Sequence, residues 1–280
     1  MTSPRKRIAL VIGSGAIKCA ASIGMYQVLE EENIKIDLVV GCSGGAIYGV
    51  GIAAGMTTDT IREISDATWT RDLMEGYLVN LKASKDGSLS FNERSGLVND
   101  TYLNRKLRAI TGERDFSDLA TPLIVVATDM LTGEPVELKE GDLFNPVRAS
   151  LAIPMIFSPW EIGGKLLIDG AASNPLPIDI AIQHGADIVL AMGFPMDYRN
   201  RFRSFTAVQE HVTSIYMNNI FKYSYAFNNL AHHSEIFPII PEFNSAISMF
   251  DVHKMPHIIA QGREATLEQL PHIKRLMDDL

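Results

Sequence analysis

The stretch LVVGCSGG, residues 38–45, says more about the fold than any other part of this chain. Its apolar start is typical of a buried strand, and the small residues at 46–55 predict a helix. Gly41, Ser43 and Gly45 form the pattern G-x-S-x-G between them. In that setting the pattern indicates a sharp turn that exposes the serine hydroxyl beside the free N–H groups of the helix. A chance glycine-rich turn is the alternative, and the flanking strand and helix favour the first interpretation.

Strand and helix signals alternate through the first two thirds of the chain. Apolar runs and helical spacing predict strands at 7–12, 37–40, 122–128 and 187–192, and helices at 23–32, 57–69, 100–110 and 178–183. A more exposed, antiparallel strand is expected within 129–138, and a hairpin over 160–168. This order predicts an α/β fold with parallel strands and helices on both faces of the sheet.

The composition changes after Pro195. A long helix at 205–230, a short strand at 236–240 and two helices at 257–270 and 273–279 are predicted there. Because no repeat, low-complexity tract or clear linker is present, we expect one domain over residues 1–280. Its core motifs would lie within 7–192 and its C-terminal helical part at about 197–280.

Two segments keep several interpretations open. Residues 198–227 interleave arginine with aromatic side chains, beginning YRNRFRSF. They would pack on the protein's own core, or meet a lipid surface, an acyl chain or a second subunit in a homodimer. Residues 71–99 are less periodic, and they predict either a mobile flap beside the site or an ordinary surface excursion.

Charge and cysteine content exclude several classes of protein. The 25 basic and 33 acidic residues give a net charge of −8, which argues against a nucleic-acid partner and against attachment to anionic lipid by charge alone. Cys19 and Cys42 do not make a disulfide framework, and no spacing suggests a metal site, so we expect reduced thiols in a cytoplasmic protein. The uncharged segment 38–56 is better explained as a buried strand, turn and helix than as a membrane span. A signal peptide over 5–12 is disfavoured because its apolar run is short and ends at Gly13.

A serine nucleophile needs a base, and the histidines are poorly placed to supply it. None of the seven follows a buried strand, and His184 precedes one, so it would lie at the opposite edge of the sheet. Asp169, in LIDGA at 167–171, follows an apolar strand and precedes Gly170, where the chain can turn sharply. Asp169 is therefore the candidate base, although an Asp-Gly pair alone is usually a plain turn.

The loop GSGAIK, residues 13–18, follows the first predicted strand. Successive N–H groups in such a turn form an anion-binding concavity. A dinucleotide site is the alternative, but Lys18 stands where that fingerprint has its third glycine, and Asp37 begins rather than ends the second strand. Because adjacent parallel strands bring their loops to one sheet edge, an oxyanion hole for Ser43 fits better.

These three motifs, in this order, resemble the patatin-like phospholipase family, in particular its small bacterial members. The stretches VRASLAIP and DGAASNPLP within 147–177 are also similar to it. The resemblance runs from about residue 7 to 192 and more loosely beyond. It implies a three-layer α/β/α sandwich, a Ser–Asp dyad without histidine, and hydrolysis of lipid acyl esters such as phospholipids or lysophospholipids. It implies neither a cofactor nor a metal, and it allows peripheral contact with a membrane.

By position in the family's motifs, Ser43 is the implied nucleophile and Asp169 the implied base. Gly13, Ser14 and Gly15 would donate N–H groups to the oxyanion, and Lys18, Gly41, Gly45 and Gly170 support the three motifs. Cys19 departs from the family, because it replaces a glycine after Lys18 and would shift the oxyanion hole. Two other functions stay open: an acyltransferase or thioesterase on the same serine turn, and a catalytically weak lipid-binding relative.

Overall fold

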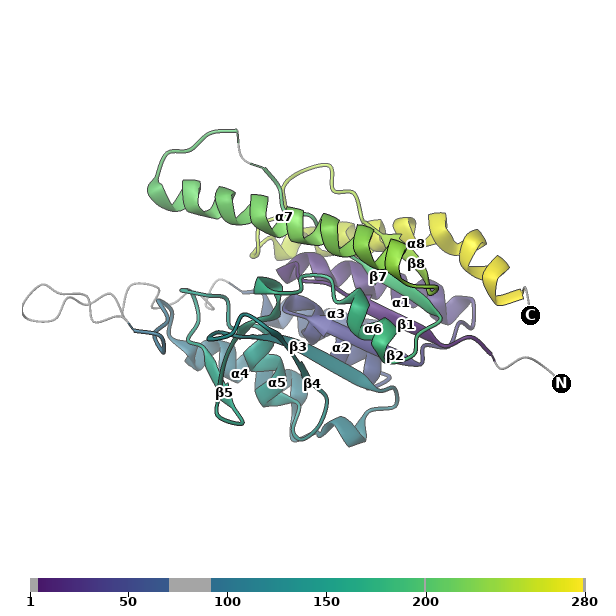
Figure 1. Ribbon diagram of the computed structural model, residues 1–280, viewed down its shortest axis with the longest axis horizontal. Helices are drawn as coiled ribbons and strands as arrows, with labels where there is room; N and C mark the ends of the chain where they lie inside the picture. Colours follow the sequence, from purple (N-terminus) through teal and green to yellow (C-terminus); the bar gives the residue numbers. More distant parts are fainter. Residues whose placement is uncertain (1–4, 71–91, 199, 279–280) are drawn as a thin grey trace, which may run out of the picture.

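A sheet of eight strands forms the centre of the molecule in the computed structural model, which describes residues 5–70, 92–198 and 200–278 (Figure 1). Hydrogen-bonded partners follow one another as β5-β6-β3-β2-β1-β7-β8, and β4 also pairs with β3. The parallel strands are β1 (Ile8–Ile12), β2 (Leu38–Cys42), β3 (Leu123–Asp129), β7 (Ile188–Met192) and β8 (Glu235–Ile239). Antiparallel pairing adds β4 (Pro135–Leu138), β5 (Trp160–Ile162) and β6 (Lys165–Asp169). The predicted mostly parallel sheet and its 160–168 hairpin are confirmed.

Helices cover both faces, so the α/β/α sandwich is also confirmed. Alternate residues of each strand point to opposite faces. Leu10 and Val39 belong to the larger apolar core, and Val11 and Val40 to the smaller one. The larger core packs against α1 (Ala21–Glu31), α2 (Gly44–Ala53), α3 (Thr58–Thr68), α4 (Asp100–Thr111), α5 (Phe144–Ser150) and α8 (Met255–Asp278). The smaller core packs against α6 (Ile178–Gln183) and α7 (Phe205–Ala231). Short 3-10 helices occupy Ala16–Ala20, Phe116–Asp118, Gly170–Ala172 and Val252–Lys254.

The C-terminal helix differs from the prediction. Residues 257–279 were expected to form two helices, but α8 is one helix with Pro271 inside it. Proline removes one helical hydrogen bond and normally favours a break. Here Leu270 and Ile273, on either side of it, are both buried in the larger core, so packing holds the two halves together.

Helices α1 and α8 pack directly against each other on the side of the sheet that carries the larger core (Figure 1). A Cβ on Gly24 would lie 2.0 Å from the carbonyl oxygen of Ile259, and one on Gly262 would lie 1.9 Å from that of Ala21. Only glycine fits at both positions. The same contact carries a two-bond ion pair between Arg263 and Glu31.

The order of strands around β3 decides where the site forms. Strand β2 pairs with residues 123–126 of β3, and β6 pairs with 127–129. Strand β4 pairs with 125–128, overlapping both, so it must use the other edge of β3. Strands β2 and β6 therefore share one edge and approach each other end to end. We call this junction the seam.

The expected flap at residues 71–99 lies largely outside the described residues, which resume at 92. From there the chain runs along the loop that follows α5. The N–H of Leu97 donates to the carbonyl of Met155, and that of Val98 donates to Ile156.

Candidate active site

Ser43 lies on a strained turn between β2 and α2. Its φ of 54° is in the left-handed region, which costs free energy for any residue other than glycine. Helix α2 starts directly under β1, because a Cβ on Gly45 would lie only 2.2 Å from the carbonyl oxygen of Ile12. A Cβ on Gly41 would meet α2 at 2.8 Å. The two glycines predicted to support this turn thus allow the helix to begin against the strands.

The strained turn is held from the side by α5. The N–H of Ser43 donates to the Oγ of Ser150 at 2.8 Å, and that hydroxyl donates to the carbonyl of Val126 at 2.6 Å. Ser150 is fully buried. It therefore ties the backbone of Ser43 to β3 without bonding the Ser43 hydroxyl.

Asp169 meets Ser43 at the seam. Cys42, the last residue of β2, is opposite Val126, and Asp169, the last residue of β6, is opposite the next residue, Ala127. The end-to-end approach leaves the Ser43 Oγ 2.6 Å from Asp169 Oδ2, a short hydrogen bond in which the hydroxyl donates. Both side chains are buried, with 6% and 4% of their surface exposed.

Further hydrogen bonds fix the orientation of the carboxylate. Its Oδ1 accepts from the N–H of Ala171 at 2.9 Å, and the Thr128 hydroxyl donates to the Asp169 carbonyl at 3.0 Å. A Cβ on Gly170 would lie 2.2 Å from the carbonyl oxygen of Val126, so only glycine lets the chain turn here against β3. The DG pair, a weak signal in the sequence, is required by this close approach.

Burial changes the acidity of Asp169. Removal from water disfavours its charged form and raises its pKa to about 6, against the smaller lowering effects of the Ser43 hydroxyl and the Ala171 N–H. At neutral pH the group is thus still ionised, and it is a stronger base than an exposed carboxylate.

The glycine loop lies beside the turn that carries Ser43, as predicted, but two of its N–H groups bond within the fold. The N–H of Gly13 donates to Met192 at 2.9 Å and that of Ser14 donates to Pro175 at 2.8 Å, so both shape the loop and are not free for an oxyanion. This revises their predicted role. Within the described residues, the N–H of Gly15 has no such partner, nor has that of Gly44 at the start of α2. A Cβ on Gly44 would lie within 3 Å of Ala16, so the loop and helix start are in direct contact.

Lys18 and the two cysteines stay outside the reacting centre. The Lys18 ammonium pairs with Asp197 at 3.2 Å, beyond the end of β7. The Cys19 thiol donates to the Gly13 carbonyl at 3.3 Å, so its side chain fills the junction between the glycine loop and the helix that follows. Cys42 packs in the smaller core, toward α6. Burial raises the pKa of both thiols, which keeps them neutral.

His184 lies at the opposite end of the sheet, as the sequence indicated. Its ring bonds Glu137 at 2.7 Å, and its carbonyl accepts from Arg7, which precedes β1. Among the described residues, no cluster of histidine, cysteine or carboxylate side chains is arranged to hold a metal ion. No helix in the described ranges has the length and apolarity needed to cross a bilayer.

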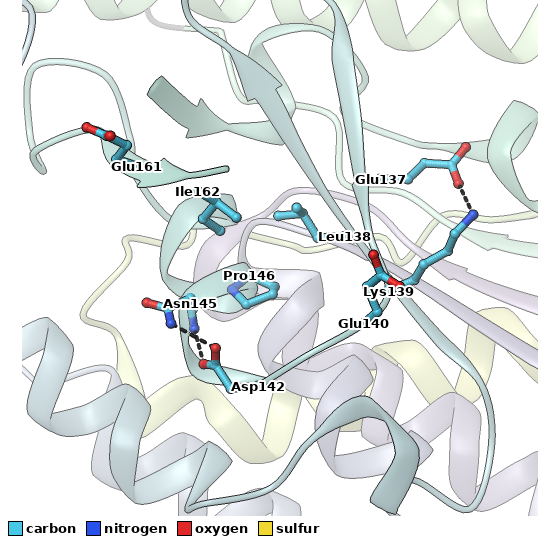
Figure 2. Close-up of a pocket in the computed structure, with 9 residues that line it drawn as sticks. All are labelled: Glu137, Leu138, Lys139, Glu140, Asp142, Asn145, Pro146, Glu161 and Ile162. Atoms are coloured by element: carbon cyan, nitrogen blue, oxygen red, sulfur yellow. Dashed lines mark hydrogen bonds and ion pairs between the residues drawn. The ribbon is translucent and has the colours of Figure 1, made fainter. Parts of the chain in front are cut away.

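A cavity of about 510 Å³ lies away from the dyad, between β4, the start of α5 and β5 (Figure 2). Its polar side chains already bond one another: Lys139 to Glu137, and Asn145 to Asp142. None of its lining residues belongs to the seam or to the glycine loop. It is therefore not the site that the sequence predicted.

Comparison with known proteins agrees with this geometry. The family model described as patatin-like phospholipase matches residues 10–182, which include the glycine loop, the serine turn and Asp169. This chain belongs to the patatin-like phospholipase family. An uncharacterized NTE family protein of Mycobacterium tuberculosis is 33% identical over 190 residues, covering 68% of this chain and 49% of its own length.

Two further similarities support the family and its fold. Patatin-like phospholipase domain-containing protein 7 of Rattus norvegicus is 30% identical over 189 residues, covering 66% of this chain and 13% of its own. The crystal structure of VipD from Legionella pneumophila matches 97% of this chain and 67% of that one, with a TM-score of 0.53 and 14% identity. This chain spans about half the length of the mycobacterial relative and 13% of the length of the rat protein.

Proposed function

We propose that this protein is a serine hydrolase that cleaves acyl ester bonds of lipids such as phospholipids or lysophospholipids. The observation that carries the proposal is the 2.6 Å hydrogen bond between the Ser43 hydroxyl and the buried carboxylate of Asp169. Membership of the patatin-like phospholipase family supports the lipid class of substrate.

In the first half of the proposed reaction, Ser43 is acylated. The ionised Asp169 accepts the hydroxyl proton as the Ser43 Oγ attacks the acyl carbonyl carbon. The negative charge that develops on the carbonyl oxygen is stabilised by the N–H groups of Gly15 and Gly44, at the positive end of α2. Asp169 then gives its proton to the departing alcohol oxygen as the ester bond breaks.

In the second half, water replaces the alcohol. Asp169 takes a proton from the water as the water oxygen attacks the acyl carbonyl carbon of the acyl-enzyme. The same N–H donors stabilise the second oxyanion. When that intermediate collapses, the proton returns to the Ser43 oxygen and the free fatty acid leaves. The cycle needs one carboxylate that both accepts and donates, which a pKa of about 6 permits.

The dyad is tested by Ser43→Ala and Asp169→Asn, each assayed on a p-nitrophenyl ester and on a phospholipid. Removing a nucleophile or its base typically costs several orders of magnitude in kcat, so we expect at least a roughly thousandfold loss in both variants. Fluorophosphonate labelling of Ser43 should fail in both. Undiminished turnover by either variant would exclude the dyad.

The free energy of unfolding shows whether the losses of turnover in these variants are due to misfolding. Because burial raises the pKa of Asp169 in the folded state, its contribution favours folding at low pH and is lost as pH rises through about 6. Asp169→Asn should therefore be more stable than the parent at pH 8, by up to roughly 3 kcal/mol, and this gain should shrink toward pH 5. Urea unfolding at both pH values measures it.

A further inference from the structure

The exposed large hydrophobic side chains of the described residues gather in two neighbouring places, with Leu267 on α8 the exception. The first, here called the apolar rim, lies in loops at or near the edge of the sheet where Ser43 sits. It consists of Met130, Leu131, Met155, Met196, Tyr198 and Phe202. The second, called the outer stripe, runs along α7. It consists of Val208, Val212, Tyr216, Tyr223, Phe227 and Leu230.

Helix α7 is amphipathic in the reverse of the usual sense. A surface helix normally buries its apolar face. The side of α7 that packs on the molecule fully buries only small or polar side chains, Ala207, Ser214, Asn218 and Asn228, and it packs Phe221 and Tyr225 partly buried against the smaller core. The outer stripe follows helical spacing on the opposite side, where Tyr223 is 74% exposed and Leu230 86%. Contiguous exposed apolar surface of this kind marks an interaction site.

The rim and the stripe are joined. The side chain of Gln209, on α7, reaches the sulfur of Met155 at 3.5 Å. The rings of Tyr198 and Phe202 lie against His211 of α7, with centroids 5.8 Å and 4.8 Å away. In Figure 1, α7 lies across the outside of the molecule, and its N-terminal end points to the side toward which β1 and β2 run. The rim therefore contacts the N-terminal part of α7, from which the outer stripe continues along the helix.

Charge favours a lipid surface over a second copy of this chain. Residues 198–231 carry four basic side chains and one acidic one, a net +3 on a chain of net −8. Arg201 and Arg203 are exposed beside the rim. Two copies would bring like charges together, and would also cover the edge that contains Ser43. The arginines lie in the loop that precedes α7, next to exposed tyrosine and phenylalanine, and basic with aromatic side chains is a combination that favours an anionic membrane interface.

We propose that the apolar rim and the outer stripe form the face by which this protein docks on an anionic lipid surface. The inference deepens the proposed function, since docked lipid would meet Ser43 at the same edge. Docking itself needs no turnover, so it can be measured with Ser43 replaced.

The experiment is flotation of the Ser43→Ala protein with vesicles of phosphatidylcholine, with and without phosphatidylglycerol. Adding Tyr216→Gln, Tyr223→Gln and Phe227→Gln together should lower partitioning at least about tenfold, because three apolar side chains no longer enter the interface. The matched control is Leu267→Gln, an exposed apolar residue on α8, which should leave partitioning unchanged. Unchanged thermal midpoints would show that all variants remain folded.

A second pair of variants tests the choice of lipid. Arg201→Gln with Arg203→Gln should weaken binding to anionic vesicles by about fivefold per residue at low salt, and should have little effect on phosphatidylcholine alone. Equal flotation of the parent and the triple variant would overturn the proposal. So would a parent dimer, by light scattering, that the triple variant dissociates without any change in flotation, since the face would then belong to a second copy. Both outcomes are read from binding and not from turnover. A failure of the docking proposal can therefore be told apart from a failure of the proposed dyad.

Discussion

At the scale of single residues, the carboxylate of Asp169 is activated by what surrounds it. The groups that act on its pKa are the apolar surroundings, one hydroxyl and one backbone N–H, and none of these is a cation. An adjacent cation would have lowered the pKa and weakened the base. Burial has the opposite effect, and the short bond to Ser43 places this stronger base on the proton that the proposed reaction moves.

This environment predicts the pH dependence of turnover. Because only ionised Asp169 can accept the Ser43 proton, kcat/KM for a soluble ester should be constant above neutrality and fall tenfold per pH unit below about 6. Initial rates from pH 4.5 to 8.5, with the folded fraction checked at each pH, measure the profile. A kcat/KM that stayed constant down to pH 4.5 would mean that Asp169 keeps an ordinary acidity and that burial does not activate it.

At the scale of elements, the order of strands and helices could be predicted because each has its own periodicity. Helix α3, with Thr57 as its cap, and the 160–168 hairpin need only local signals. The seam could not be derived in that way. The stretch at 165–169 shows a strand but not its partner, and only the pairing of β2 and β6 along β3 brings Asp169 to Ser43.

The contribution of α5 was also missed. Its seven residues are too few for a clear helical period, so VRASLAIP was recognised only as a family likeness. Ser150, at its end, has no local feature that marks it, since its two hydrogen bonds go to residues far away in the sequence. Likewise, nothing in GSGAIK tells which of its N–H groups the fold itself will use.

The close contact of α1 with α8 gives a prediction at this scale. Gly262→Ala would place a Cβ 1.9 Å from the Ala21 carbonyl, so the helices must separate or tilt. We expect a loss of about 1–3 kcal/mol in the free energy of unfolding, measured in urea. Glu268→Ala, at an exposed position of the same helix, is the control and should change stability by less than about 0.5 kcal/mol. Equal stability of both variants would show that this contact is looser than the structure indicates.

At the scale of the whole molecule, the motifs and the C-terminal part share one core. The larger apolar core includes residues of β1 and β2 together with Ile258, Leu270 and Ile273 of α8. The family model ends at residue 182, well before these residues. We therefore propose that residues 1–280 fold as one unit, and that α8 is needed by the part of the chain that carries the motifs.

Truncation tests this proposal. A chain ending at residue 240 would lose α8 and uncover the apolar side of α1, whose Gly24 packs on it. We expect that chain to be insoluble, or to melt without a cooperative transition by near-UV circular dichroism. A truncated protein that melted cooperatively near the parent's temperature would instead make the C-terminal part an appendage.

Strand β3 also sets the distance between the two side chains of the proposed dyad. Neither β2 nor β6 contacts the other along its length, and each takes its position from β3. Sliding either one by a single residue would change the gap between hydroxyl and carboxylate by about 3.3 Å, enough to end proton transfer. The proposed reaction therefore depends on the alignment of a strand that supplies neither reacting group.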